Sequence, residues 1–171
     1  MIKKLPDNTV VVVTAGRGSV DDMAAADLLQ EPAIKVPLFI CLPKGLPNTV
    51  PEIVSTMDIA PTLYDLADIH PPQHVQGSSL MSAPPRNWAL SRLRNLNLPH
   101  QTAFRSENWK LILTHGASDV MRLFNLTTDP SEATNLAETP DNQDRLEDML
   151  DLLIDARVAL EDRLEPRIAK F

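Results

Sequence analysis

The first candidate for chemistry in this chain is a short loop that follows a run of β-branched residues. Residues 10–13 (VVVV) lead directly into residues 14–18 (TAGRG). Loops at the carboxyl ends of strands are the usual place for ligands in α/β sheets. Gly16 offers no side-chain donor, and the permanent positive charge of Arg17 repels a divalent cation. A guanidinium also suits sulfate or phosphate, so Arg17 is either an anion clamp or a solvated loop residue. The second is favoured, because one arginine is only part of an anion-binding fork.

The histidines do not predict a metal site. His70 and His74 are four residues apart, but two prolines lie between them. They therefore cannot share the face of one helix, which a two-histidine site on a helix requires. His100 and His115 have no evident partner in the sequence, and we expect surface positions for the loop histidines.

The acidic residues are better explained by structure than by catalysis. Asp58 is interpreted as a helix N-cap, and Asp65 and Asp68 as solvent-facing helix residues. Asp21 and Asp22 are alternatives for metal ligands near the first loop. They are disfavoured, because hard cations need several converging oxygens.

The hydrophobic pattern predicts an α/β first half. The runs at 10–13 and 35–42 lack polar alternation, which is typical of strands covered on both faces in a parallel sheet. Helices are expected at 21–30, ended by Pro32, and at 59–67, where apolar residues recur at helical spacing. The proline- and serine-rich segment 70–85 is expected to cross the surface.

The second half predicts a small antiparallel sheet and a helix. Residues 109–113 and 121–126 read as two strands of a hairpin. Thr139 and Pro140 are expected to cap and open the last helix. Its predicted apolar stripe comprises Leu146, Met149, Leu150, Leu153 and Ile154. Trp88 and Trp109 are interpreted as packing residues.

Composition excludes several classes of function. The 171 residues are 43% hydrophobic and carry a net charge of -7, which suits a folded domain and argues against nucleic-acid binding. No apolar run reaches the ~20 residues of a membrane span. The amino-terminal residues do not form a convincing signal peptide, because Pro6 interrupts the apolar stretch. Cys41 is the only cysteine and excludes an intrachain disulfide. As the chain stands we expect it in the cytoplasm, and the sequence leaves its compartment open.

Six segments, in order, resemble sulfatases of the alkaline-phosphatase superfamily. They are residues 8–15 (NTVVVVTA), 31–40 (EPAIKVPLFI), 54–69 (VSTMDIAPTLYDLADI), 77–80 (GSSL), 109–112 (WKLI) and 123–136 (LFNLTTDPSEATNL). The resemblance implies a partial alkaline-phosphatase-like α/β sheet with flanking helices in residues 1–85. It implies a C-terminal subdomain, with an antiparallel hairpin and a helix, in residues 86–171.

The resemblance also indicates what the chain lacks. Sulfatases use a formylglycine, made in a Cys/Ser-x-Pro-x-Arg motif, beside a calcium ion held by carboxylates and an amide. Gly16 and Arg17 occupy the positions of the family's metal pair. Cys41 starts a similar motif, but Gly45 stands where arginine is needed. No catalytic residue, metal ligand or bound cofactor is therefore expected in this chain.

Four hypotheses about function follow. The favoured one is a sulfatase-family chain that is truncated or degenerate and inactive alone. A second is an active sulfuric-ester hydrolase whose missing half comes from another chain. A third is a non-catalytic assembly module, in which a second copy or a partner chain covers an open sheet edge. The fourth is a phosphatase or phosphonate-ester hydrolase relative.

Overall fold

The computed structural model describes residues 5–19, 27–45, 48–84, 86–95, 98–116 and 119–161. Backbone contacts divide the chain into two units, Met1–Pro51 and Glu52–Phe171, and each unit is described by itself. The resemblance to sulfatases predicts a different boundary, between residues 85 and 86. That boundary separates segments that resemble two parts of a sulfatase, which a division by backbone contacts does not test, so it stays a prediction.

The first unit contains a two-stranded antiparallel ribbon. Strand β1 (Val11–Thr14) pairs with β2 (Leu38–Cys41), and Val13 lies opposite Phe39. The side chains of these two residues are 50% and 61% exposed. The expectation of parallel strands covered on both faces is therefore wrong for the described residues. An unbroken apolar run favours a strand, but it does not specify the strand's partner or what covers its faces.

The helix of this unit begins near Pro32, where the sequence pattern predicted that a helix would end. Helix α1 spans Glu31–Ile34 and has Pro32 in its first turn. Proline is tolerated there because the first N–H groups of a helix have no intrahelical acceptor. The proline expected to end a helix therefore opens one. Residues 21–26 of the expected helix lie outside the described residues.

The second unit is built on a four-stranded antiparallel sheet. Its strands, in spatial order, are β3 (Trp88–Asn95), β4 (Leu98–Ser106), β5 (Trp109–His115) and β6 (Val120–Asn125). The predicted hairpin is confirmed, since β5 and β6 pair with Leu111 opposite Leu123. Strands β3 and β4 double the size of that sheet. Their sequences mix polar and apolar residues without regular alternation.

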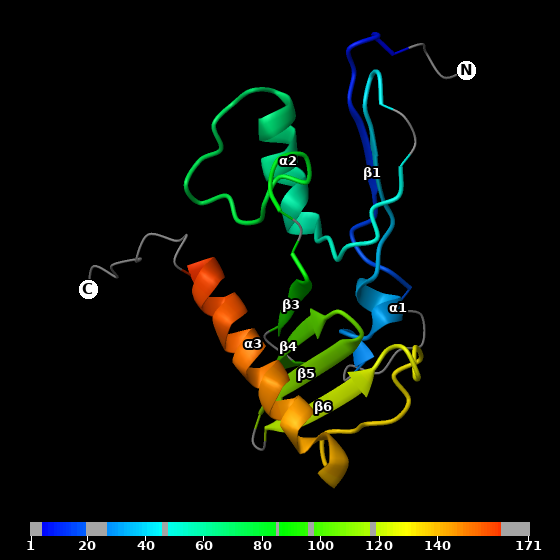
Figure 1. Cartoon of the computed structure of the whole chain (residues 1–171), viewed down its shortest axis with the longest axis vertical. Helices are drawn as coiled ribbons and strands as arrows, with labels where there is room; N and C mark the ends of the chain where they lie inside the picture. The colour runs from blue at the N-terminus through cyan, green and yellow to red at the C-terminus, as the bar shows by residue number, and fades with distance from the viewer. Residues whose placement is uncertain are drawn as a thin grey trace, which may run out of the picture. The chain divides into compact units, whose positions relative to one another are not determined.

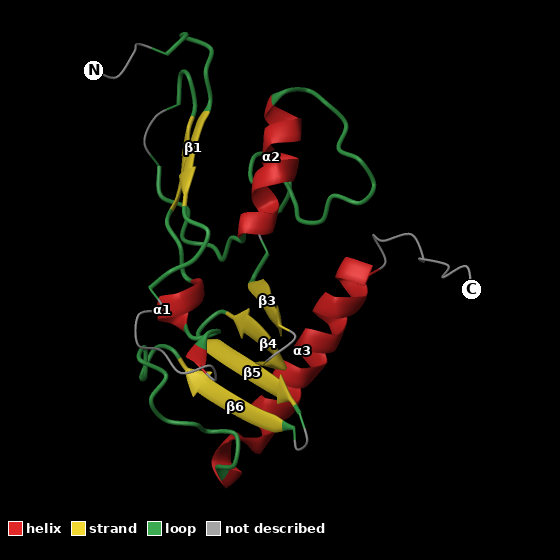
Figure 2. Cartoon of the chain, turned by 180° about the vertical axis from the view of Figure 1, so that it is seen from behind, coloured by secondary structure: helices red, strands yellow, loops and turns green. Residues whose placement is uncertain are grey.

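Helix α3 (Gln143–Glu161) lies across one face of this sheet (Figure 1). Figure 2 shows the opposite side, with the helix passing behind the strands. The buried core between them comprises Phe104, Leu111, Leu123, Ala137, Leu146, Met149, Leu153 and Ala156. Most of the predicted stripe is therefore confirmed. Ile154 is 57% exposed, so its place in the stripe is wrong. Trp88 and Trp109 pack against this core as predicted.

The start of α3 differs in detail from the prediction. Thr139 takes the N-cap position of a 3-10 turn, Pro140–Asn142, but its side chain makes no capping hydrogen bond. Gln143 instead donates from Nε2 to the carbonyl oxygens of Ala137 and Thr139, at 2.9 and 3.2 Å. The side-chain amide thus ties the helix back to the loop before it.

Helix α2 (Ile59–Leu66) follows a 3-10 turn, Thr56–Asp58, as the pattern at 59–67 predicts. The chain then turns at Asp68, whose φ is 55°. The long loop after α2 returns to β3 (Figure 1). None of the helices in the described ranges is both long and apolar enough to cross a membrane.

Candidate functional site

In the loop after β1, Gly18 is packed against the backbone, whereas Gly16 and Arg17 face open space. The amide of Gly18 donates to the carbonyl oxygen of Ala33 at 2.8 Å, and a Cβ on Gly18 would lie 2.0 Å from the Pro32 oxygen. Only glycine allows this close approach. A Cβ on Gly16, by contrast, would meet no atom within 4 Å, and Arg17 is exposed. The loop position is fixed, but it presents no side-chain oxygen at these two positions.

The other candidates that lie in described ranges do not form a metal cluster. In the described parts of the chain, no three His, Cys, Asp or Glu side chains are placed to hold a metal ion. Asp21 and Asp22 lie outside those parts. Cys41 is exposed at the end of β2. Its strand is half of a ribbon with one open face, not the interior of a sheet.

The structure gives two histidines a partner that the sequence does not reveal. His100 and His115 are opposite each other on β4 and β5. The Nδ1 atom of His115 lies 3.6 Å from Oδ1 of Asp119, with both side chains at least half exposed. His70 and His74 are exposed, as expected for loop residues. The register between β4 and β5 brings His100 and His115 together, and that register depends on the whole sheet.

Asp58 is the centre of a buried hydrogen-bond network. Its Oδ2 accepts from the Ser55 amide at 2.9 Å and from Arg86 Nη2, and its Oδ1 accepts from the Ser78 amide at 2.9 Å. Ser55 caps the 3-10 turn, because its hydroxyl accepts from the Met57 amide. Asp58 occupies the N-cap position of α2 as interpreted, but its side chain makes no capping hydrogen bond to that helix. It is the acidic member of a capping box, and it also binds a distant loop and the arginine just before β3.

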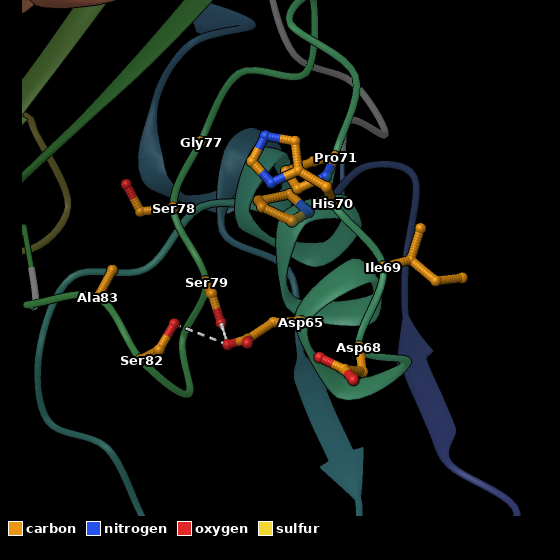
Figure 3. A pocket seen from close by; sticks show the side chains of 11 residues that line it. Asp65, Asp68, Ile69, His70, Pro71, Gly77, Ser78, Ser79, Ser82 and Ala83 are labelled. Atoms are coloured by element: carbon orange, nitrogen blue, oxygen red, sulfur yellow. Dashed lines mark hydrogen bonds between the residues drawn. The ribbon is translucent and has the colours of Figure 1, made fainter.

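Two further side chains of α2 bind the same loop. The hydroxyl of Thr62 accepts from the Leu80 amide at 3.0 Å. Asp65 accepts from the hydroxyls of Ser79 and Ser82, as Figure 3 shows. Asp65 is exposed, as interpreted, but it also accepts these two hydrogen bonds, which its interpretation as a solvent-facing residue did not include. The spacing of Asp58, Thr62 and Asp65 on one helix face, followed by a serine-rich loop, is the signal that could have revealed this contact.

A polar pocket of about 600 Å³ lies between α2 and the loop (Figure 3). Its polar lining comprises Asp65, Asp68, His70, Ser78, Ser79 and Ser82. The hydroxyls of Ser79 and then Ser82 lower the pKa of the Asp65 carboxyl below its usual range. Because the folded pKa is lowered, this stabilisation is present above the unfolded pKa and is lost as pH falls through the folded one. The contact therefore persists at neutral pH.

Gly77 lets the loop approach the start of α2. Its φ is +95°, and a Cβ there would lie 2.3 Å from the carbonyl oxygen of Met57. Both observations require glycine. The first residue of the GSSL segment thus has a steric role, and the amide of the second is the one that Asp58 binds.

The segment at 123–136 also has a structural role. Glu132, with φ of 54°, places its Oε1 2.9 Å from Lys110 Nζ, and both side chains are fully buried. Asp129 accepts from the amides of Thr134 and Ala133, and these bonds lower the pKa of its carboxyl. The lysine of the WKLI segment and the glutamate of the later segment are therefore partners in one ion pair.

Asn135 covers the edge of β6. Its Oδ1 accepts from the Leu123 amide at 2.9 Å, and its Nδ2 donates to the Met121 carbonyl oxygen at 3.2 Å. The Leu136 amide then donates to the Leu123 carbonyl oxygen. One side-chain amide thus pairs with an exposed strand edge as a neighbouring strand would.

Comparison with known proteins decides the family. The model of "N-sulphoglucosamine sulphohydrolase, C-terminal" matches residues 25–159 of this chain. This chain belongs to the sulfatase family. The match contains α2, the loop after it, the four-stranded sheet and most of α3, whereas residues 14–18 precede it. The assignment of Gly16 and Arg17 to the sulfatase metal pair therefore stays a prediction.

The sulfatase relatives are much longer than this chain. Arylsulfatase K of Bos taurus is 35% identical over 127 residues, which are 64% of this chain and 23% of the relative. Arylsulfatase K of Mus musculus is 32% identical over 157 residues, which are 78% of this chain and 28% of the relative. The chain spans about a quarter of the length of these sulfatases.

Solved structures confirm the expected fold class. A protein solved in complex with its substrate D-glucosamine-2-N,6-O-disulfate matches with a TM-score of 0.81 and 23% identity, over 91% of this chain and 35% of that chain. The phosphonate monoester hydrolase of Agrobacterium radiobacter matches with a TM-score of 0.71 and 23% identity, over 95% of this chain and 37% of that one. At this identity the likeness concerns the fold.

Proposed function

We propose that this sulfatase-family chain is the C-terminal part of a sulfuric-ester hydrolase and does not hydrolyse sulfate esters by itself. One observation carries the proposal. The loop after β1 presents a glycine and an exposed arginine, at the positions that the resemblance assigns to the sulfatase metal pair. The short span of the chain relative to Arylsulfatase K supports it.

The described residues do not fit a calcium ion. Calcium takes six to eight oxygen ligands, several of them carboxylates. Gly16 contributes no side chain, Arg17 contributes a positive charge, and the described ranges hold no cluster of three candidate ligands. The buried carboxylates among these residues have other partners: Asp58 binds Arg86, and Glu132 binds Lys110. We therefore assign no step of ester cleavage to this chain.

The test is a hydrolysis assay with the purified chain. We expect no turnover of p-nitrophenyl sulfate with added calcium, at chain concentrations where an intact arylsulfatase is readily measured. The same assay with p-nitrophenyl phosphate and a phosphonate monoester covers the other hydrolases of this fold. Turnover that rises with chain concentration and disappears with a calcium chelator would refute the proposal.

A double variant tests whether the two substituted residues alone prevent calcium binding. The open surroundings of Gly16 accommodate an aspartate without a clash, so Gly16→Asp with Arg17→Asn restores the family residues sterically. We still expect no tight calcium binding by calorimetry, since two ligands are fewer than calcium requires. Tight binding by this double variant would show that the remaining ligands are already present in the chain.

A second candidate function is assembly through the β1–β2 ribbon. Isolated two-stranded ribbons are only marginally stable, and unpaired strand edges pair readily with other chains. The exposed Val13–Phe39 pair on this ribbon favours such contact. We expect a second copy to cover it, so sedimentation should show reversible dimers that Phe39→Ser weakens at least about tenfold, a 1.4 kcal/mol effect. A strict monomer at all concentrations would contradict this candidate.

A further inference from the structure

The loop after α2 is attached to that helix at two levels. We call residues 70–84 the strap. At the inner level, the amides of Ser78 and Leu80 donate to Asp58 and Thr62. At the outer level, the hydroxyls of Ser79 and Ser82 donate to Asp65. The three helix residues are four and three positions apart, so they form one row along the helix.

The inner attachment is buried and reinforced. Asp58 is 2% exposed and Thr62 is fully buried. The Thr62 hydroxyl also donates to the Asp58 carbonyl oxygen at 2.6 Å, so the two residues are joined. Arg86 holds the carboxylate of Asp58 from the other side. Breaking these bonds leaves buried polar groups with fewer partners than they need, which is costly.

The outer attachment is exposed and local. Asp65 and Ser82 are both exposed, and two hydroxyls share the single oxygen Oδ2. Water can replace both hydrogen bonds when they break, so their net contribution is small. Segments held by few buried contacts open locally while the rest of a protein stays folded.

We infer that the strap is a conformational device with a releasable segment: Asp65 holds residues 81–84 closed over the pocket, and they open while Thr62 and Asp58 keep Leu80 and Arg86 bound on either side of them. Opening widens the polar pocket beside Asp68 and His70 (Figure 3). This device is independent of ester hydrolysis and goes beyond the proposed function.

Amide hydrogen exchange in the full chain tests this inference. Four amides report on the two levels: those of Ser78 and Leu80 on the inner one, and those of Met81 and Ala83, which donate to the hydroxyl and carbonyl oxygens of Ser79, on the outer one. We expect Asp65→Asn to speed exchange about tenfold at the outer pair and less than about twofold at the inner pair, because a neutral amide accepts more weakly than a carboxylate.

Asp68→Asn is the matched control. It removes the same charge from the same pocket, and asparagine tolerates the left-handed backbone of this residue. We expect it to leave all four amides unchanged. Thr62→Val breaks the inner level and should speed exchange at Leu80 as well as at the outer pair. Equal acceleration of all four amides by Asp65→Asn, or none, would overturn the inference.

Discussion

Replacing Lys110 with methionine is expected to lower the free energy of unfolding by about 3–5 kcal/mol, because it leaves a buried carboxylate without its cation. The ammonium lies 2.9 Å from Glu132 Oε1, and neither side chain reaches solvent. A carboxylate cannot be rehydrated at that depth without opening the loop that follows β6. Urea denaturation followed by circular dichroism measures the loss.

The double variant Lys110→Met with Glu132→Met distinguishes an ion-pair effect from a packing effect. Apolar replacement of both partners is often nearly neutral, because the desolvation cost disappears with the charges. We therefore expect the double variant to recover most of the stability that the single variant loses. A single variant as stable as the unaltered chain, or a double variant as unstable as the single one, would contradict this account.

Replacing Asp58 with alanine is expected to lower the free energy of unfolding by a similar amount, about 3–5 kcal/mol, since it removes a buried partner of a charged group. The variant leaves the Arg86 guanidinium, which is 14% exposed, and the amides of Ser55 and Ser78 without their acceptor. Thermal unfolding followed by calorimetry measures the effect. The strap should also lose its inner attachment, which the exchange of the Ser78 amide would report.

Asp65→Ala is the control for this second prediction. It removes a carboxylate from the same helix face, but from an exposed position whose partners are two hydroxyls that water can satisfy. We expect a much smaller loss of stability than for Asp58→Ala. Equal losses for the two variants would mean that burial does not separate the inner level from the outer one.

Local signals in the sequence were sufficient for the elements that repeat one pattern over many residues. The 3.6-residue spacing at 59–67 and after Pro140 predicted α2 and most of the buried stripe of α3. The short segments 109–113 and 121–126, joined through Gly116, predicted the β5–β6 hairpin. The order of six short segments indicated the sulfatase family, which the family match confirms. Each signal is contained within one segment, so no distant contact was needed to read it.

Short and mixed segments were harder to interpret. Strands β3 and β4 combine arginine, serine and histidine with apolar residues, so their role as sheet strands becomes evident only from pairing with β5. Pro32 was ambiguous, since proline both ends helices and opens them, and the backbone before it decides which.

The sequence by itself determined the family, the main helices and the absence of side-chain oxygen at Gly16 and Arg17, because residue identity alone settles those points. Only the tertiary structure decided which polar residues are joined: Asp58 to Arg86 and Ser78, Lys110 to Glu132, and Asn135 to the edge of β6. These partners are separated by 12 to 28 residues. Such pairs meet only after the sheet has taken its register and the loops have closed, which no local pattern specifies.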